Sequence, residues 1–361
     1  MSTVKEVLSA YRDFSFGDRL MFYLTLSSDM DIQKDTLPEI LEEARPSISS
    51  ECYYCHSPRI VRNGHRGDGT QRYLCRDCRK SFTCKTDTFL SGSHKHFHIW
   101  MKYLTCMTEK KTLKESAMAC GLSMGTAFAW RHKILSALKP SERSICLEGI
   151  VEADETYFNV SYKGNHTNSQ NFEMPREPHK RGASVHKKGL SDEKVCVACA
   201  VSKAGNALSR PVKTGKVSTD CLEFAFHDRI LSGSVLCTDN EKAYIGYAFR
   251  HGIDLVQMET DQRTKGSYGI QRINAYHSRL KGFTGIFRGV STKYLDHYLV
   301  WHDRLLCRNE EPDSRLHAVL DLCFSFGQHI CSRELSKMPA VPGNGTAVSL
   351  LSAAGREEVS A

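Results

Sequence analysis

The chain has 361 residues, of which 40% are hydrophobic and 25% charged, and it carries a net charge of +8. This composition excludes a largely disordered or collagen-like chain. The sequence contains no apolar run of about 18 residues or more, so no membrane span is predicted. The N-terminal residues show no apolar segment after a basic start, so no secretory signal is predicted. Fifteen cysteines, an odd number, favour reduced thiols and metal ligation over a disulfide framework. We therefore expect a cytoplasmic protein of two or three domains.

The positive charge is concentrated in one part of the chain. Residues 51–150 contain 17 basic and 8 acidic side chains, against 5 and 9 in residues 1–50 and 27 and 24 in residues 151–361. A local excess of this kind indicates a polyanion such as nucleic acid, although a solvated basic surface gives the same pattern. Residues 1–48 are interpreted as an acidic, helical N-terminal extension.

Two Cys-x-x-Cys pairs in residues 49–90 predict a zinc ribbon. Each pair directs two sulfurs at one centre, and four thiolates are typical of a closed structural Zn²⁺ site. The predicted ligands of this single zinc ion are Cys52, Cys55, Cys75 and Cys78. Basic residues between the pairs are candidate DNA contacts, namely Arg62, Arg66 and Arg72.

Residues 91–145 are predicted to be helical and to contain a helix-turn-helix. Thr112 with Glu115 fits a capping box, Gly121 fits the turn, and Ser123 can cap the second helix. The second helix would enter the major groove, although a plain helical hairpin is the simpler interpretation of an isolated pattern. Its candidate DNA contacts are Thr126, Arg131 and Lys133.

After residue 148 the sequence predicts three strands, two of which carry an acidic residue. The apolar runs are residues 149–157, 194–201 and 234–238, with Asp154 inside the first and Asp239 directly after the third. An acidic side chain in such a run is costly to bury unless it is paired or bound to metal. The two aspartates therefore suggest a divalent cation site, with structural aspartates at strand ends as the alternative.

Ordered sequence blocks give the chain a family resemblance over about residues 35–308. Besides the ribbon cysteines they are Trp130–Ile134, Glu152–Thr156, Lys188–Ser191, Thr238–Asn240, Asn274–Lys281 and Phe287–Leu295. With these blocks the chain resembles the zinc-ribbon insertion-sequence transposases of the IS-fifteen-ninety-five group, which are DDE-type enzymes. The resemblance implies an α/β fold in which an RNase H-like catalytic domain, a mixed sheet flanked by helices, occupies residues 146–310. It also implies two catalytic Mg²⁺ or Mn²⁺ ions and double-stranded DNA as partner, held by a homodimer or a larger synaptic complex.

By this resemblance Asp154 and Asp239 are the first two catalytic residues, and the third position departs from the usual Glu. His277 stands where the relatives carry the acidic residue, and Asn274 is the competing third ligand. Asn274, His277 and Lys281 are spaced to lie on one face of a helix, so all three can point into one site. We expect His277 to be the ligand and Lys281 to hold a DNA phosphate.

The composition of the remaining segments suggests their roles. The long polar insertion of residues 159–188 is a candidate DNA clamp through Lys180, Arg181, Lys187 and Lys188, or a solvated loop. Residues 311–361 are interpreted as a partly disordered tail.

The function that the resemblance implies is two-metal phosphoryl transfer on the terminal inverted repeats of a bacterial insertion sequence, at the nucleoid. A catalytically decayed DNA-binding regulator and an RNase H-like junction nuclease are the alternatives.

Overall fold

The computed structural model describes residues 10–11, 14, 18–19, 22, 47–67, 69–164, 193–259, 264–306, 312–325, 334–335 and 338. The chain divides into two compact units, one of residues 1–140 with 310–332 and one of residues 141–309 with 333–361. Most of the expected N-terminal extension and residues 165–192 of the polar insertion, including its four candidate DNA contacts, lie outside the described residues.

The first unit contains a small antiparallel sheet, which follows the short helix α4 (Ser47–Ser50). Its strands are β1 (Ile60–His65), β2 (Gln71–Cys75) and β3 (Ser81–Phe82), in that order across the sheet. The buried core beneath it consists of Cys52, Tyr73, Cys75 and Phe82. Two of these four residues are predicted zinc ligands, so this core is too small to stabilise the sheet without the cysteine site.

Three helices follow, and the sequence predicted both ends of the second and the start of the third. They are α5 (Phe97–Thr108), α6 (Leu113–Cys120) and α7 (Met124–Leu138), and a 3₁₀ turn (Lys139–Ser144) comes after them. Thr112 and Glu115 form the capping box, Gly121 ends α6 at a φ of 61°, and the Ser123 hydroxyl caps α7. A positive φ is the conformation for which glycine is favoured, so the helix-turn-helix signals are confirmed as local structure.

A further helix of this unit comes from the segment expected to be a tail. Helix α12 (Pro312–Ser325) packs against α5 and α7. It buries Leu316, Val319, Leu320 and Cys323, which follow helical spacing. No helix was predicted within the partly disordered tail expected from residue 311, and this stretch is helical because its apolar face completes the core of the first unit.

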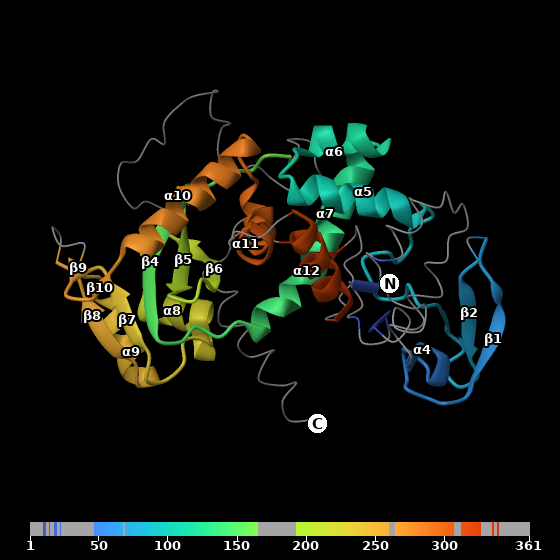
Figure 1. Cartoon of the computed structure of the whole chain (residues 1–361), viewed down its shortest axis with the longest axis horizontal. Coiled ribbons are helices and arrows are strands. Elements are labelled where there is room, and N and C mark those ends of the chain that lie inside the picture. Colours follow the sequence, from blue (N-terminus) through green and yellow to red (C-terminus); the bar gives the residue numbers. More distant parts are fainter. Residues whose placement is uncertain are drawn as a thin grey trace, which may run out of the picture. The chain divides into compact units, whose positions relative to one another are not determined.

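The second unit is built on a five-stranded mixed sheet (Figure 1). Its order is β6-β5-β4-β7-β8, in which β4, β5 and β6 are antiparallel neighbours while β7 and β8 run parallel to β4. The mixed sheet flanked by helices that the sequence implied is confirmed. The strands are β4 (Ile150–Asn159), β5 (Lys194–Ser202), β6 (Ala207–Thr214), β7 (Val235–Thr238) and β8 (Asp254–Gln257).

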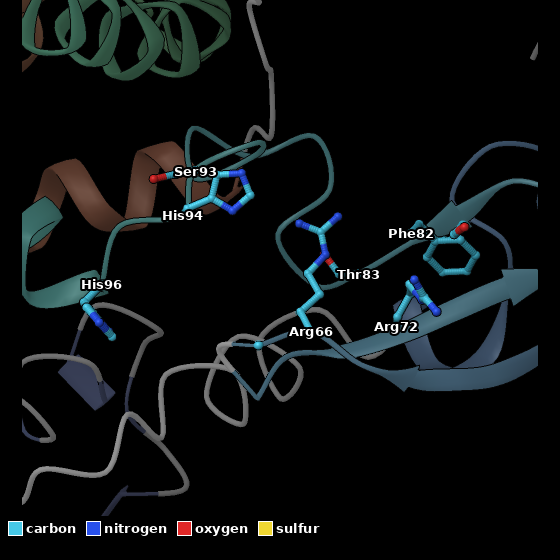
Figure 2. Close-up of a pocket in the computed structure, with 9 residues that line it drawn as sticks. Arg66, Arg72, Phe82, Thr83, Ser93, His94 and His96 are labelled. Carbon is cyan, nitrogen blue, oxygen red and sulfur yellow. The ribbon is translucent and has the colours of Figure 1, made fainter.

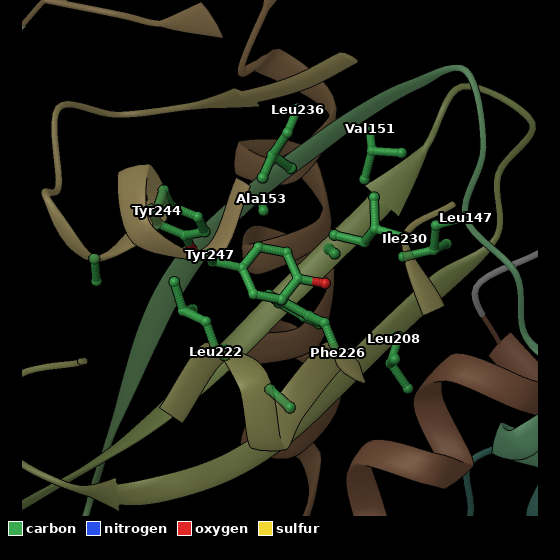
Figure 3. Close-up of a cluster of buried hydrophobic side chains, with 14 of the residues drawn as sticks. Leu147, Val151, Ala153, Leu208, Leu222, Phe226, Ile230, Leu236, Tyr244 and Tyr247 are labelled. Atoms are coloured by element: carbon green, nitrogen blue, oxygen red, sulfur yellow. The ribbon is translucent and has the colours of Figure 1, made fainter. Parts of the chain in front are cut away.

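Alternation along the strands sends side chains to two helical layers. Val151 and Ala153 of β4 join the core against α8 (Thr219–Phe226) and α9 (Ala243–His251), as Figure 3 shows. The next residues along β4 point to the opposite face, which α10 (Gln271–Ile286) and α11 (Leu295–Trp301) cover. The minor elements are 3₁₀ turns at His227–Arg229 and Thr292–Tyr294, a hairpin of β9 (Thr264–Lys265) and β10 (Tyr268–Gly269), and a π-helical turn at His302–Leu306.

No helix among the described residues is long and apolar enough to cross a membrane.

Candidate active site and metal centre

Of the two aspartates predicted to be catalytic, Asp154 lies on β4 and Asp239 directly after the neighbouring parallel strand β7. Glu152 of β4 is paired with Cys237 of β7, and two residues further along each strand the chain carries Asp154 and Asp239. Asp154 is two residues from Glu152, whose side chain contacts the start of α10, so Asp154 faces the α10 side of the sheet as well. Asp239 stands just beyond the carboxyl end of β7, where the backbone N–H of Glu241 donates to its Oδ1 at 3.1 Å.

The electrostatics of this pair favour a cation. Burial, together with repulsion from Asp239, raises the pKa of Asp154 to about 6. The hydrogen bond from the Glu155 backbone and the positive charge of Lys281 act in the opposite direction but do not compensate. Two adjacent carboxylates that repel one another in a half-buried site are stabilised by a positive charge placed between them.

Helix α10 brings a histidine to the same place. His277 is 8% exposed, and its Nδ1 lies 3.7 Å from Oδ2 of Asp154. Burial, followed by repulsion from Lys281, lowers the pKa of His277 to about 4, so the imidazole is neutral near pH 7. Its Nε2 is buried without a hydrogen-bond partner among the described residues. A neutral imidazole with an unused nitrogen has the form that ligates a metal ion.

The other two predicted residues of α10 differ in their surroundings. Lys281 is exposed, and its charge acts on both Asp154 and His277, which places it at the rim of the site. Asn274 is exposed as well, and no hydrogen bond found among the described residues joins its amide to either aspartate. The structure thus brings Asp154, Asp239, His277 and Lys281 together.

Two further acidic residues of β4 adjoin the site, and neither was among the predicted site residues. The buried carboxylate of Glu152 accepts hydrogen bonds from Arg272 and Ile273 at the start of α10. Glu155 points to the other face of the sheet, where the Tyr244 hydroxyl donates to its Oε1 at 2.6 Å. Their spacing from Asp154 was the available signal, because strand residues two apart, such as Glu152 and Asp154, share a face while the consecutive residue Glu155 faces the opposite side.

The four cysteines predicted to bind zinc converge on one point. Their sulfurs all lie within 4.8 Å of one another, with Cys52 to Cys78 at 3.6 Å and Cys55 to Cys75 at 3.7 Å. Sulfurs placed about 2.3 Å from a central ion at tetrahedral corners are about 3.8 Å apart, so the cluster matches a Zn²⁺ site. Backbone N–H donation, chiefly from Cys78, lowers the pKa of Cys75 to about 7, which favours the ligating thiolate.

The carboxylates are less tightly grouped than the cysteines. Among the described residues the cysteines are the one group of three or more His, Cys, Asp or Glu donors close enough together to hold a metal ion. Asp154, Asp239 and His277 do not form a group of this kind.

The ribbon presents its predicted DNA contacts on an open surface. Arg62, Arg66 and Arg72 are all exposed. Arg66 and Arg72 line a cavity of about 740 Å³, and Figure 2 shows them on the ribbon side with His94 and His96 on the segment before α5. The other lining residues are Gly67, Ser81, Phe82, Thr83 and Ser93, so none of the described residues around the cavity is acidic.

Helix α7 does not present the side chains expected of a recognition helix. Arg131 is 1% exposed, and its Nη2 donates to the carbonyl of Lys111 at 2.9 Å and to Ser116 Oγ at 3.3 Å. Arg131 is thus a brace between helices, and its interpretation as a DNA contact is wrong. Lys133 is half-buried and donates to the Ser91 carbonyl at 2.6 Å. The accessible part of α7 is its first turn, which includes Thr126.

Comparisons with known proteins relate the second unit to mobile elements. Residues 146–300 match the family model of the ISXO2-like transposase domain. A protein in the transposable element ISH50 of Halobacterium salinarum is 25% identical over 195 residues, which is 54% of this chain and 63% of that protein. The chain therefore spans less than two thirds of the length of this relative.

Solved structures give weaker likenesses. A simian T-cell lymphotropic virus intasome in complex with the PP2A regulatory subunit B56 gamma has a TM-score of 0.26 and 12% identity, covering 48% of this chain and 56% of that chain. The Mos1 transposase paired-end complex with left transposon end has a TM-score of 0.25 and 12% identity, covering 63% and 79%. Neither score is high enough to assign an activity. The sequence match carries the comparison: residues 146–300 of this chain match the ISXO2-like transposase domain family.

Proposed function

We propose that the chain is a DNA transposase that binds the terminal inverted repeats of an insertion sequence and catalyses metal-dependent strand cleavage and strand transfer. One observation carries the proposal: Asp154 of β4 lies close enough to Asp239, just beyond the parallel strand β7, to feel its charge, and Nδ1 of His277 lies 3.7 Å from Oδ2 of Asp154. This convergence occurs inside the segment that matches the transposase family model. In the cell the enzyme would act in the cytoplasm, on the bacterial nucleoid.

The proposed metal ligands are Asp154, Asp239 and His277, with Asn274 as the alternative third ligand. The unused Nε2 of His277 and the mutual repulsion of the two carboxylates support the assignment. Two Mg²⁺ or Mn²⁺ ions held there would supply charge stabilisation and an activated nucleophile for in-line phosphoryl transfer. Lys281, exposed at the rim, is placed to bind a phosphate of the DNA strand. A structural Zn²⁺ held by the four cysteines is proposed for the ribbon.

DNA binding is proposed to begin at the first unit. Arg62, Arg66 and Arg72 are exposed on the ribbon, and the cavity that the last two line has no acidic wall among the described residues. The first turn of α7, with Thr126, provides a second contact. Phosphate binding by arginine supplies affinity without sequence readout, so end recognition would come from few side chains. Two ends must be joined, and we propose a homodimer or larger synaptic complex.

The test uses a supercoiled plasmid that carries the reading frame with its genomic flanks. Wild-type protein with Mg²⁺ or Mn²⁺ is expected to nick the plasmid at the element ends and to join those ends to a target. Asp154→Asn and Asp239→Asn should still shift end DNA in a gel but should cut about 10³-fold more slowly or not at all. Asp254→Asn, an exposed change at the start of β8 in the same sheet, is the matched control and should cut normally.

Other outcomes separate the alternatives. A wild-type protein that shifts DNA but never cuts it with either ion is a regulator, and one that cuts branched junctions regardless of sequence is a junction nuclease. Cleavage by both aspartate variants at the wild-type rate would refute the proposed site. If His277→Ala stays active while Asn274→Ala is inactive, the third ligand is Asn274.

A further inference from the structure

Helix α10 is held at its start by a residue of the strand that carries Asp154. Glu152 of β4 is 2% exposed, and its carboxylate accepts from the backbone N–H groups of Arg272 at 2.6 Å and Ile273 at 3.0 Å. The Arg272 guanidinium donates to the other carboxylate oxygen at 2.6 Å. The N-cap residue, Ile270, gives no side-chain hydrogen bond of its own. Glu152 therefore caps α10 from a different element of the fold, and both of its oxygens are used.

The end of α10 is tied to the segment that follows β4. The Lys163 ammonium donates to the carbonyls of Phe287 at 3.1 Å, Arg288 at 3.4 Å and Gly289 at 3.0 Å. A short ladder fixes the same place, since Ser161 N–H donates to Thr292 Oγ1 and Thr292 N–H donates to the Ser161 carbonyl, both at 2.8 Å. An anion at the start of a helix and a cation at its end both complement the helix dipole.

The spacing along the two elements matches. Asp154 follows Glu152 by two residues on the same face of β4, a distance of about 6.6 Å along a strand. His277 follows Ile273 by four residues, about 6 Å along a helix, and both side chains are buried. When Glu152 holds the backbone of Ile273, His277 is therefore brought opposite Asp154.

We propose that Glu152 is a positioning residue of the transposase site, which sets the separation of His277 and Asp154 by anchoring the first turn of α10 to β4. The inference rests on the proposed function for its catalytic readout. Glu152 does not serve as the missing third carboxylate, because it is buried and its oxygens are already bonded to α10. It acts on the chemistry through the helix that it holds.

Three variants of Glu152 separate positioning from charge. Glu152→Gln keeps the length and one acceptor for the helix N–H groups but loses the charge, whereas Glu152→Asp keeps the charge but is one methylene too short. Glu152→Ala removes both. A positioning role predicts that Gln preserves function better than Asp, while a role through charge predicts the reverse order. Glu148→Ala, an exposed change just before β4, is the matched control.

Two measurements are made on the full chain. Hydrogen exchange of the first-turn amides of α10, with β5 amides as the internal reference for global folding, reports the anchor without any catalysis. Electron paramagnetic resonance with Mn²⁺ alone reports metal affinity, and plasmid cleavage reports the rate. In Glu152→Ala we expect faster exchange confined to α10, and Mn²⁺ affinity and cleavage each reduced about 10- to 100-fold.

The outcomes distinguish this inference from the proposed function. Unchanged exchange in α10, or loosened exchange with unchanged Mn²⁺ affinity, would overturn the positioning role, as would Asp outperforming Gln. If no variant and no wild-type protein cuts DNA, the proposed function fails, while exchange and Mn²⁺ binding still decide the role of Glu152. Faster exchange in β5 of Glu152→Ala would identify global unfolding of that variant. The role of Glu152 is then decided by whether Glu152→Gln or Glu152→Asp preserves function better.

Discussion

Replacing Glu155 by glutamine should remove a loss of folding stability that the second unit suffers as the pH rises. The Glu155 carboxyl is half-buried and bonded to the Tyr244 hydroxyl. Burial is the largest cause that raises its pKa from 4.5 to about 8, and repulsion from Asp154, Asp239 and Glu241 adds to it against the hydrogen bond from Tyr244. The folded protein therefore keeps a proton on Glu155 that the unfolded chain loses above about pH 4.5.

This difference in protonation determines how the unfolding free energy changes with pH. Below the unfolded pKa both states are protonated and the group has no effect, and between about 4.5 and 8 stability falls by about 1.4 kcal/mol per pH unit. Between pH 5.5 and 7.5 the loss due to Glu155 is about 3 kcal/mol at most, because partial solvent access reduces it. Glu155→Gln keeps the acceptor for Tyr244 and cannot ionise, so this loss disappears.

The assay is hydrogen exchange of the β4 and β5 amides at pH 5.5 and 7.5, corrected for intrinsic rates, in buffer without added divalent ions. These strands are the buried centre of the sheet, so their slowest amides report the free energy of unfolding. Asp154 contributes a similar slope to wild type and variant and cancels in the difference. Glu148→Gln, at an exposed position, should keep the wild-type slope. Equal slopes for wild type and Glu155→Gln would refute the reasoning.

Three other predictions concern the metal centre and the packing of helices. Wild-type protein should hold one zinc ion per chain by mass spectrometry and give a four-thiolate absorption spectrum with Co²⁺. Cys75→Ser should lose both the metal and the ordered structure of the ribbon. An unchanged zinc content in Cys75→Ser would exclude this site. Arg131→Met should lower the unfolding free energy of the first unit by about 2 kcal/mol, because buried hydrogen bonds are lost. If this variant instead binds DNA more weakly at unchanged thermal stability, Arg131 is a DNA contact after all. Gly246→Ala in α9 should lower the unfolding free energy of the second unit by about 1–3 kcal/mol, because the added Cβ would lie 3.0 Å from Thr219 Oγ1. The control Gly282→Ala in α10 meets no atom within 4 Å and should stabilise slightly. Equal melting shifts of the two variants would contradict the packing argument.

Local signals were sufficient for much of this structure. The cysteine pairs, the capping box at Thr112, the turn at Gly121 and the strand that carries Asp154 depend on neighbours within a few residues, which a sequence displays directly. Strand β5 was visible as an unbroken apolar run because both of its faces are buried. The family resemblance then supplied the pairing of Asp154 with Asp239, which lies beyond local patterns.

The rest depended on contacts between distant segments. Strand β6 was missed because Pro211 and the polar residues around it fit an edge strand, a position that only the assembled sheet defines. Arg131 carries the charge of a DNA contact, and nothing local reveals that Ser116 and the Lys111 carbonyl take its guanidinium. Glu152 and its partners on α10 are 120 residues apart, so the cap is invisible to any local rule.

The place of α12 in the chain has a consequence for synthesis. The helix belongs to the first unit, although the ribosome makes it only after all the strands of the second unit. During translation the second unit can therefore complete its sheet while α5 and α7 still lack the helix that covers them. A fragment that stops at residue 140 would be released with that apolar surface open. A chain cut after residue 309 would keep every proposed catalytic residue yet lose part of the unit proposed to bind DNA. Attempts to express the two halves separately should therefore join α12 to the end of the first by a short linker.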